Sequence, residues 1–388
     1  MDHQTLILIE SCHAQFQLAH YLDVSWVENS ITTTDSETWR NYPGKKVIIK
    51  EWSHCTNPDL PPATDSHTNY ENADLIIVTY NEALGTPWHE VQSICEQWFG
   101  KASVVFITNG TIQDTQRRDV WYNRSLIWFD LVAWGNTDYV TKTHAVKPYL
   151  FDAIMGQIKP HREYVWHRLC EDSLLDKSLV ALYRVNADIN SYDDYHGIND
   201  RYNINQVPDF YESPNLNNLE DPLIQKIKSQ STNRNGFSCT GVGKNLVFEP
   251  GRRMWLSLKT SQGIYDSSWY SIVTETSYEN YDFLSEKVAK AILAKRIFVL
   301  FRSYGQLALL RSHGFKTFDG IIDETYDTID HAKTRFNLAW QQVQYLAHQD
   351  PVMLYTKADE ILEHNRTVLL NITDRHLAIR NFISPYLL

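Results

Sequence analysis

Glu286 and Lys287 stand side by side where the sequence predicts that a helix begins. Apolar residues recur downstream at helical spacing, so one face of this segment should pack inward. Either Asp282 or Ser285 can act as the N-cap. Lys287 would then lie in the first turn, where the helix dipole disfavours a cation by up to ~1 kcal/mol.

A bound diphosphate would explain Lys287, because an anion can bind both the ammonium group and the N–H groups of a helix start. Glu286 could accept hydrogen bonds from ribose hydroxyls at the same place. The alternative is a solvated Glu–Lys pair on an exposed helix end. The pair therefore predicts an anion site only together with the sequence around it.

The first half of the chain alternates short apolar runs with polar or helical connectors, and residues 88–100 fit one such helix. Continuous apolar strands that alternate with helices indicate a parallel sheet covered on both faces. Such sheets bind ligands beyond the carboxyl ends of their strands. The predicted buried strands are residues 6–10, 46–50, 74–80, 103–110 and 126–135.

The sequence divides into three predicted parts. Residues 1–145 form an N-terminal Rossmann-like domain, and residues 150–330 form a second α/β domain. Within the latter, residues 185–235 are polar, Asn-rich and without periodicity, which is typical of a lid, a binding insertion or a disordered segment. Residues 331–388 follow a helical pattern.

The second domain has its own predicted order of elements. We expect residues 151–159 to form a loop, and the helix that follows should begin near Pro160. Its predicted strands are residues 178–184, 269–276 and 296–301.

Composition is that of a globular protein, with 388 residues of which 43% are hydrophobic and 21% charged. The formal net charge is −11 and no basic block is present, so bulk attraction to nucleic acid or to an anionic membrane is not expected. The sequence shows no signal-peptide pattern, no apolar membrane span and no metal-type spacing of its five cysteines. We therefore expect the cytoplasm of the producing or host cell.

Residues 271–327 resemble the C-terminal domain of fucosyltransferase-like glycosyltransferases, which are built from two Rossmann-type domains. In that family a strand ends in a Glu and an Asn-rich loop, and Tyr-x-(Thr/Ser)-Glu-Lys opens the next helix. Here the strand ends in Glu275, and residues 285–287 supply Ser-Glu-Lys. Tyr281 or Phe283 replaces the tyrosine of the motif.

A second part of the resemblance is the stretch KPHREYVWHRL, which contains Arg162. In the family an arginine just before the first helix of this domain clamps the donor diphosphate. A guanidinium group suits that role because it binds two phosphate oxygens at once. The resemblance covers residues 150–185 and 265–330, and residues 313–327 also look like a segment of uncharacterised glycosyltransferase-like proteins of phages and other viruses.

The resemblance implies an α/β fold with two Rossmann-like domains facing a central cleft (GT-B type) and C-terminal helices. It also implies an inverting glycosyltransferase that uses a nucleotide diphosphate sugar, possibly GDP-linked, and an unknown hydroxyl acceptor. Residues 1–145 would then bind the acceptor, and residues 150–330 would bind the nucleotide sugar. The sequence lacks an Asp-x-Asp motif, so we expect no metal and no cofactor besides the donor substrate. The implied donor-binding residues are Arg162, Glu275, Tyr281, Ser285, Glu286 and Lys287.

Glycosyl transfer also needs a base that takes the proton of the acceptor. Glu10 and His13 follow the first predicted strand, so they would lie at the carboxyl edge of the N-terminal sheet, and either is a candidate. Alternatively, Glu10 caps the next helix and His13 is a buried core residue.

Two other functions stay open at this point. One is a non-catalytic nucleotide- or glycan-binding protein of the same fold. The other is a viral DNA-base glycosyltransferase, against which the acidic net charge weighs because a groove that follows phosphates usually needs clustered Lys and Arg.

Overall fold

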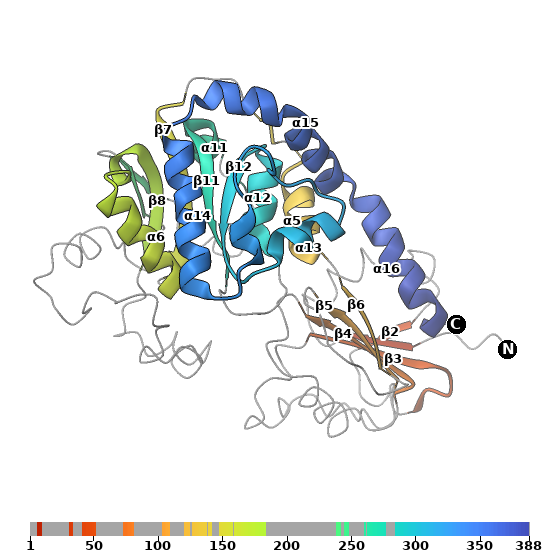
Figure 1. Cartoon of the computed structure of the whole chain (residues 1–388). Coiled ribbons are helices and arrows are strands. Elements are labelled where there is room, and N and C mark those ends of the chain that lie inside the picture. Colours follow the sequence, from red (N-terminus) through yellow and green to blue (C-terminus); the bar gives the residue numbers. More distant parts are fainter. Residues whose placement is uncertain are drawn as a thin grey trace, which may run out of the picture. The chain divides into compact units, whose positions relative to one another are not determined.

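The structure is a computed structural model of the whole chain (Figure 1). The residues that it describes are 6–9, 31–33, 41–51, 73–80, 103–108, 120–124, 126–137, 139–141, 147–157, 159–183, 238–241, 244–247, 260, 262–276 and 284–387. The predicted helix at 88–100 and the insertion at 185–235 lie outside these ranges.

The chain divides into two compact units. The first consists of Met1–Ile127, Tyr281–Phe283 and Asn371–Leu388, and the second of Trp128–Asn280 and Leu284–Leu370. These units are defined by contacts in space, so each combines segments that are distant in the sequence. Each unit contains one six-stranded sheet.

The sheet of the first unit is parallel throughout, in the order β2-β1-β3-β4-β5-β6. Side chains such as Ile48, Ile76 and Val104 are completely buried, as expected for strands that are covered on both faces. The structure confirms the predicted strands that begin at residues 6, 46, 74 and 103. The strands are β1 (Leu6–Ile9), β2 (Ile31–Thr33), β3 (Lys46–Glu51), β4 (Leu75–Tyr80), β5 (Ser103–Thr108) and β6 (Val120–Arg124).

The prediction of a buried strand at 126–135 was wrong, because this segment forms helix α5 (Ile127–Gly135). Phe129, Val132 and Ala133 are fully buried and recur at the spacing of one helical face. A short run that is apolar on all sides cannot be assigned to helix or strand by periodicity alone. The sequence did not indicate two strands of this sheet, β2 and β6, and β6 directly precedes α5.

The sheet of the second unit has the order β10-β9-β8-β7-β11-β12. Strands β8, β7, β11 and β12 are parallel to one another. Strand β9 pairs antiparallel with both β8 and β10. The structure confirms the three strands predicted for this unit. The strands are β7 (Tyr149–Gln157), β8 (Ser178–Tyr183), β9 (Ser238–Gly241), β10 (Lys244–Val247), β11 (Ser268–Thr274) and β12 (Ile297–Phe301).

The prediction of a loop at 151–159 was also wrong, because strand β7 occupies most of this segment and lies inside the sheet. Asp152 interrupts the apolar run, which hid the strand. Its buried carboxylate accepts hydrogen bonds from Ser268 (2.8 Å) and Ser271 (2.9 Å) and lies 3.6 Å from the guanidinium of Arg296. The tertiary partners that permit a buried Asp in a strand are more than 110 residues away, so no local pattern shows them.

Helices cover both faces of this second sheet. The connections β7–α6–β8 and β11–α12–β12 lead in opposite directions along the sheet, so right-handed crossovers place α6 (Pro160–Glu171) and α12 (Glu286–Leu293) on opposite faces. Figure 1 shows α14 (Ala332–Ala347) beside α6. The rings of Tyr164 in α6 and Phe336 in α14 are in contact, with their centroids 5.8 Å apart. The remaining helices are α11 (Gln262–Ser267), α13 (Gln306–Ser312), α15 (Pro351–Leu370) and α16 (Ile372–Leu387), with short 3-10 turns at Leu175–Lys177 and Thr325–Thr328.

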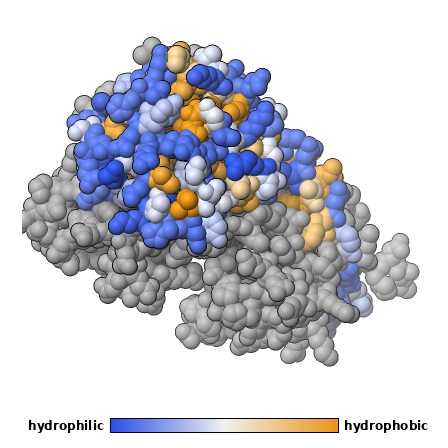
Figure 2. Space-filling model, in the orientation of Figure 1, coloured by the Kyte–Doolittle hydropathy of each residue, from blue (hydrophilic) through white to orange (hydrophobic). Residues whose placement is uncertain are grey.

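The architecture therefore confirms the α/β class, with two Rossmann-like sheets and helices at the C-terminal end of the chain. The surface of the second unit that is coloured in Figure 2 is mostly hydrophilic, with apolar residues in small groups. Among the described helices, none is long and apolar enough to cross a membrane.

Candidate functional site

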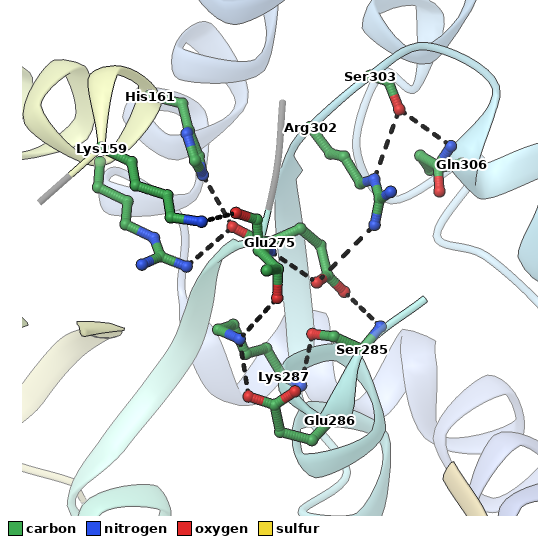
Figure 3. Close-up of polar contacts among 11 residues, drawn as sticks. Lys159, His161, Glu275, Ser285, Glu286, Lys287, Arg302, Ser303 and Gln306 are labelled. Carbon is green, nitrogen blue, oxygen red and sulfur yellow. Dashed lines mark hydrogen bonds and ion pairs between the residues drawn. The ribbon is translucent and has the colours of Figure 1, made fainter. Parts of the chain in front are cut away.

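The candidate site lies where the strand order of the second sheet reverses. From β7 the chain continues to β8 and β9 on one side, and it later returns to β11 on the other side of β7. In open parallel sheets, ligands bind beyond the carboxyl ends of the strands at such a switch point. The described segments that follow β7 and β11 meet there: residues 159–162, residues 275–276 and residues 284–287, whose polar contacts are drawn in Figure 3.

Glu275 connects the end of β11 with the start of α12. Its carboxylate is completely buried and accepts hydrogen bonds from the backbone N–H of Thr276 (3.1 Å) and of Ser285 (3.1 Å). We therefore assign Glu275 a positioning role in this structure, because it fixes the first residue of the helix start. Contact of Glu275 with a donor molecule stays a prediction.

Ser285 is the N-cap of α12, which decides between the two candidates that the sequence offered. Its side-chain oxygen accepts a hydrogen bond from the N–H of Lys287 (3.2 Å). The helix buries Val288, Ala289 and Ala291, so its first turn is held against the sheet. The predicted helix start is thus confirmed, with Lys287 in the first turn.

The side chains of Glu286 and Lys287 form an ion pair at this helix start. Lys287 Nζ donates to Glu286 Oε1 at 2.7 Å and to Thr276 Oγ1 at 3.3 Å. The side chain of Lys287 keeps 20% of its surface exposed and that of Glu286 keeps 14%. The pair is therefore neither a freely solvated surface pair nor closed to a ligand.

The charges of Glu286 and Lys287 in the first turn of α12 and of Lys290 in its last turn act on one another. Burial raises the pKa of Glu286, but the neighbouring Lys287 and Lys290 and a hydrogen bond from its own backbone N–H hold that pKa below its usual value. Burial lowers the pKa of Lys290 to about 8, with Glu286 raising it and Lys287 lowering it. The carboxylate of Glu286 is therefore ionised at neutral pH, between two ammonium groups.

Three side chains from the start of α6 hold the backbone after β11. Arg162 Nη2 donates to the carbonyl oxygen of Glu275 at 3.0 Å, and His161 Nε2 contacts the same oxygen at 2.8 Å. Lys159 Nζ donates to the carbonyl oxygen of Thr276 at 2.5 Å. Burial lowers the pKa of His161 well below its usual value, so the imidazole is neutral and Nε2 carries the proton that the carbonyl accepts.

The structure brings Arg162 next to the predicted helix start, as the resemblance implies, but its observed partner is a carbonyl group. Arg162 is buried, with 4% of its surface exposed. Its role as a diphosphate clamp stays a prediction. The sequence did not single out Lys159 and His161, which lie three positions and one position before Arg162, so proximity to Arg162 was the available signal.

The end of β12 adds a further group of polar residues. Arg302 Nη1 lies 3.9 Å from Glu275 Oε2, and both Arg302 Nε (3.4 Å) and Gln306 Nε2 (3.1 Å) contact Ser303 Oγ. Two buried oxygens at this edge, Gln306 Oε1 and Thr274 Oγ1, have no hydrogen-bond partner in the described part of the chain. Unsatisfied buried polar atoms are rare in folded proteins and indicate an additional partner such as a ligand or water.

Positive charge exceeds negative charge among these residues. The cationic side chains are those of Lys159, Arg162, Lys287, Lys290 and Arg302, against the carboxylates of Glu275 and Glu286. The whole chain carries a net charge of −11, so this local excess is opposite to the average of the protein. Such a local field favours an anionic ligand.

Glu10, His13 and Tyr281 lie outside the described residues, so their predicted roles stay predictions. Within the described ranges, no group of three or more His, Cys, Asp or Glu side chains is placed to hold a metal ion. The expectation of metal-independent chemistry also stays a prediction.

No protein-family model matches the sequence, and no curated protein matches it. Among solved structures, the chain is similar to the DNA-modifying enzyme β-glucosyltransferase, whose crystal structure was determined in the presence and absence of its substrate uridine diphosphoglucose. The two chains share 10% sequence identity, the match covers 99% of each, and the TM-score is 0.46.

Proposed function

We propose that the protein is a glycosyltransferase that moves a sugar from a nucleotide diphosphate sugar to an acceptor hydroxyl. The observation that carries this proposal is the position of Lys287. It lies in the first turn of α12, at the switch point of a parallel sheet, within a cationic group of side chains. An anion with more than one phosphate fits this arrangement, because both the helix start and several cations can contact it.

Glycosyl transfer breaks the bond between the anomeric carbon and a diphosphate oxygen. Negative charge develops on the departing diphosphate, and donors that are already in place stabilise it. Lys287 and the backbone N–H of Glu286 supply such donors once the Glu286 carboxylate moves aside, and Glu275 together with Arg162 fixes the backbone that carries them. Arg302 contributes a further positive charge beside Glu275.

The acceptor half of the reaction depends on the predicted base. Glu10 or His13 would take the proton of the acceptor hydroxyl as it attacks the anomeric carbon, and a direct attack inverts that carbon. The sequence resemblance favours a GDP-linked donor.

The first experiment measures binding of GDP, UDP, CDP and ADP by calorimetry, with and without EDTA, to the wild-type protein and to Lys287→Ala. We expect one nucleotide to bind in both conditions and its affinity to fall about 100-fold in the variant, since a charge-assisted contact contributes about 2–3 kcal/mol. Lys357→Ala, which removes an exposed lysine from α15, is the matched control and should bind like wild type.

Absence of binding by all four nucleotides would contradict the proposal. Where one nucleotide binds, transfer from its sugar conjugates to glycan acceptors and to duplex DNA is measured next. Binding without transfer or donor hydrolysis would point instead to a non-catalytic nucleotide-binding protein.

A further inference from the structure

Glu286 occupies the position that an anion would take at the start of α12. Its carboxylate contacts Lys287 Nζ at 2.7 Å and accepts a hydrogen bond from its own backbone N–H. The next N–H of the helix, that of Lys287, is bonded to Ser285 Oγ. In the structure, the protein's own side chains therefore satisfy the groups that attract a phosphate.

A simple anion must compete with this carboxylate. Phosphate or pyrophosphate that approaches Lys287 either displaces Glu286 or lies next to its negative charge, and both cost binding free energy. Burial makes the repulsion stronger than on an open surface, because only 14% of the Glu286 side chain is exposed. Glu286 therefore lowers the affinity of the site for every anion that brings only negative charge.

A ligand with hydroxyl donors beside its diphosphate can offset this cost. Ionised carboxylates only accept hydrogen bonds, and two neighbouring hydroxyls can both donate to one carboxylate. A ribose with free 2′ and 3′ hydroxyls has this arrangement, and it is joined to the diphosphate in a nucleotide. Recognition of this kind rejects wrong ligands by repulsion as well as selecting the right one by attraction.

We propose that Glu286 is a specificity residue that excludes inorganic phosphate and pyrophosphate from the donor site and admits a ribonucleoside diphosphate. This inference rests on the proposed function, because it concerns the same site. Its new content is the exclusion of anions that lack hydroxyls.

The test compares sodium pyrophosphate with the best-bound nucleoside diphosphate of the panel, using calorimetry on wild type and Glu286→Gln. Glutamine has nearly the same shape and still accepts hydrogen bonds, but it carries no charge. We expect pyrophosphate affinity to rise about tenfold in Glu286→Gln, while nucleotide affinity changes less than about threefold. The 2′-deoxy form of the nucleotide should bind wild type more weakly than the ribo form, by a factor that shrinks in the variant.

Glu171→Gln is the matched control, because it removes one carboxylate from an exposed pair with Arg168 on α6. It should leave both affinities at the wild-type value. Thermal unfolding of both variants shows whether they are folded.

The outcomes separate the two proposals. Nucleotide binding that depends on Lys287, together with an unchanged ratio of pyrophosphate to nucleotide affinity in Glu286→Gln, would overturn the role of Glu286 and keep the proposed function. Absence of nucleotide binding in both wild type and Glu286→Gln would overturn the proposed function and this inference with it.

Discussion

Two helices begin side by side in the second unit, and they differ in which side chains accept hydrogen bonds from their first backbone N–H groups. Helix α12 follows β11 and helix α13 follows β12, and these strands are parallel neighbours. At α13, the buried carboxylate of Asp327 accepts hydrogen bonds from three consecutive N–H groups, at 2.9, 3.0 and 3.3 Å. At α12, the hydroxyl of Ser285 accepts a hydrogen bond from the N–H of Lys287, and the side chains of Glu286 and Lys287 form an ion pair beside it.

The difference shows why only one of the two helix starts is a candidate ligand site. Gly305, with φ of 78°, directs its N–H to the carbonyl oxygen of Asp327 at 2.7 Å, so the turn before α13 is closed as well. A ligand anion at α13 would have to remove a side chain that is held by the fold. At α12 it has only to move Glu286, whose carboxylate is partly exposed.

Removal of Asp327 should have the largest effect on stability. Asp327→Ala leaves three N–H groups without their acceptor, two of them in a buried place, and we expect the free energy of unfolding to fall by about 3 kcal/mol. Urea denaturation measures this loss. A change below about 1 kcal/mol would mean that water replaces the carboxylate easily, and the contrast between the two helix starts would disappear.

Lys287→Ala should have a small effect on stability and a large effect on nucleotide binding. Its cation lies in the first turn, against the helix dipole, so its removal should change the free energy of unfolding by less than about 0.5 kcal/mol. Nucleotide affinity should still fall about 100-fold, or about 2.7 kcal/mol. If unfolding and binding were weakened equally, Lys287 would be a structural residue like Asp327.

Ser285→Ala tests whether the α12 start is held by its cap or by the Glu275 carboxylate. Loss of an N-cap hydroxyl costs about 1 kcal/mol, and we expect that loss in urea denaturation. Ser285→Thr keeps the hydroxyl and is the control. A cost equal to that of Asp327→Ala would show that both helix starts depend on their caps to the same degree.

The smallest expected effect is a dependence of binding on pH. Burial, opposed by Glu286 and assisted by Lys287, lowers the pKa of Lys290 to about 8, so its ammonium group loses the proton as pH rises through that value. The group attracts phosphate only when it is charged, and nucleotide affinity should therefore fall about threefold between pH 7 and pH 9. In Lys290→Met the affinity should be lower at pH 7 and nearly constant over this range, whereas an unchanged slope would exclude Lys290.

The sequence predicted elements whose signal is local. Runs such as VI at 47–48 and LII at 75–77 are buried in strands, and the Ser-Glu-Lys start of α12 is where the helical pattern placed it. The sequence did not predict β7, because Asp152 is compatible with a strand only through its contacts with distant serines and with Arg296. The same limit applies to α13, since Asp327 lies about 20 positions beyond the N–H groups that it caps.

The site itself was predicted only in part for a related reason. Lys287, Glu286 and Ser285 are adjacent in the sequence, so their joint role at a helix start was accessible. That Arg162 lies beside Glu275 follows from the pairing of β7 with β11, which the sequence reading did not include because β7 was expected to be a loop. The roles of Lys159 and Arg302 require the same strand order.

The carboxylate of Glu275 has a consequence for how this protein could change during evolution or design. One side chain joins the N–H groups of Thr276 and Ser285, so it clamps both ends of the intervening connection. When the ends of a connection are fixed, its length and composition can vary at a small cost in closure entropy. A change in the length or composition of the segment between these ends should therefore leave the Ser-Glu-Lys start of α12 in place.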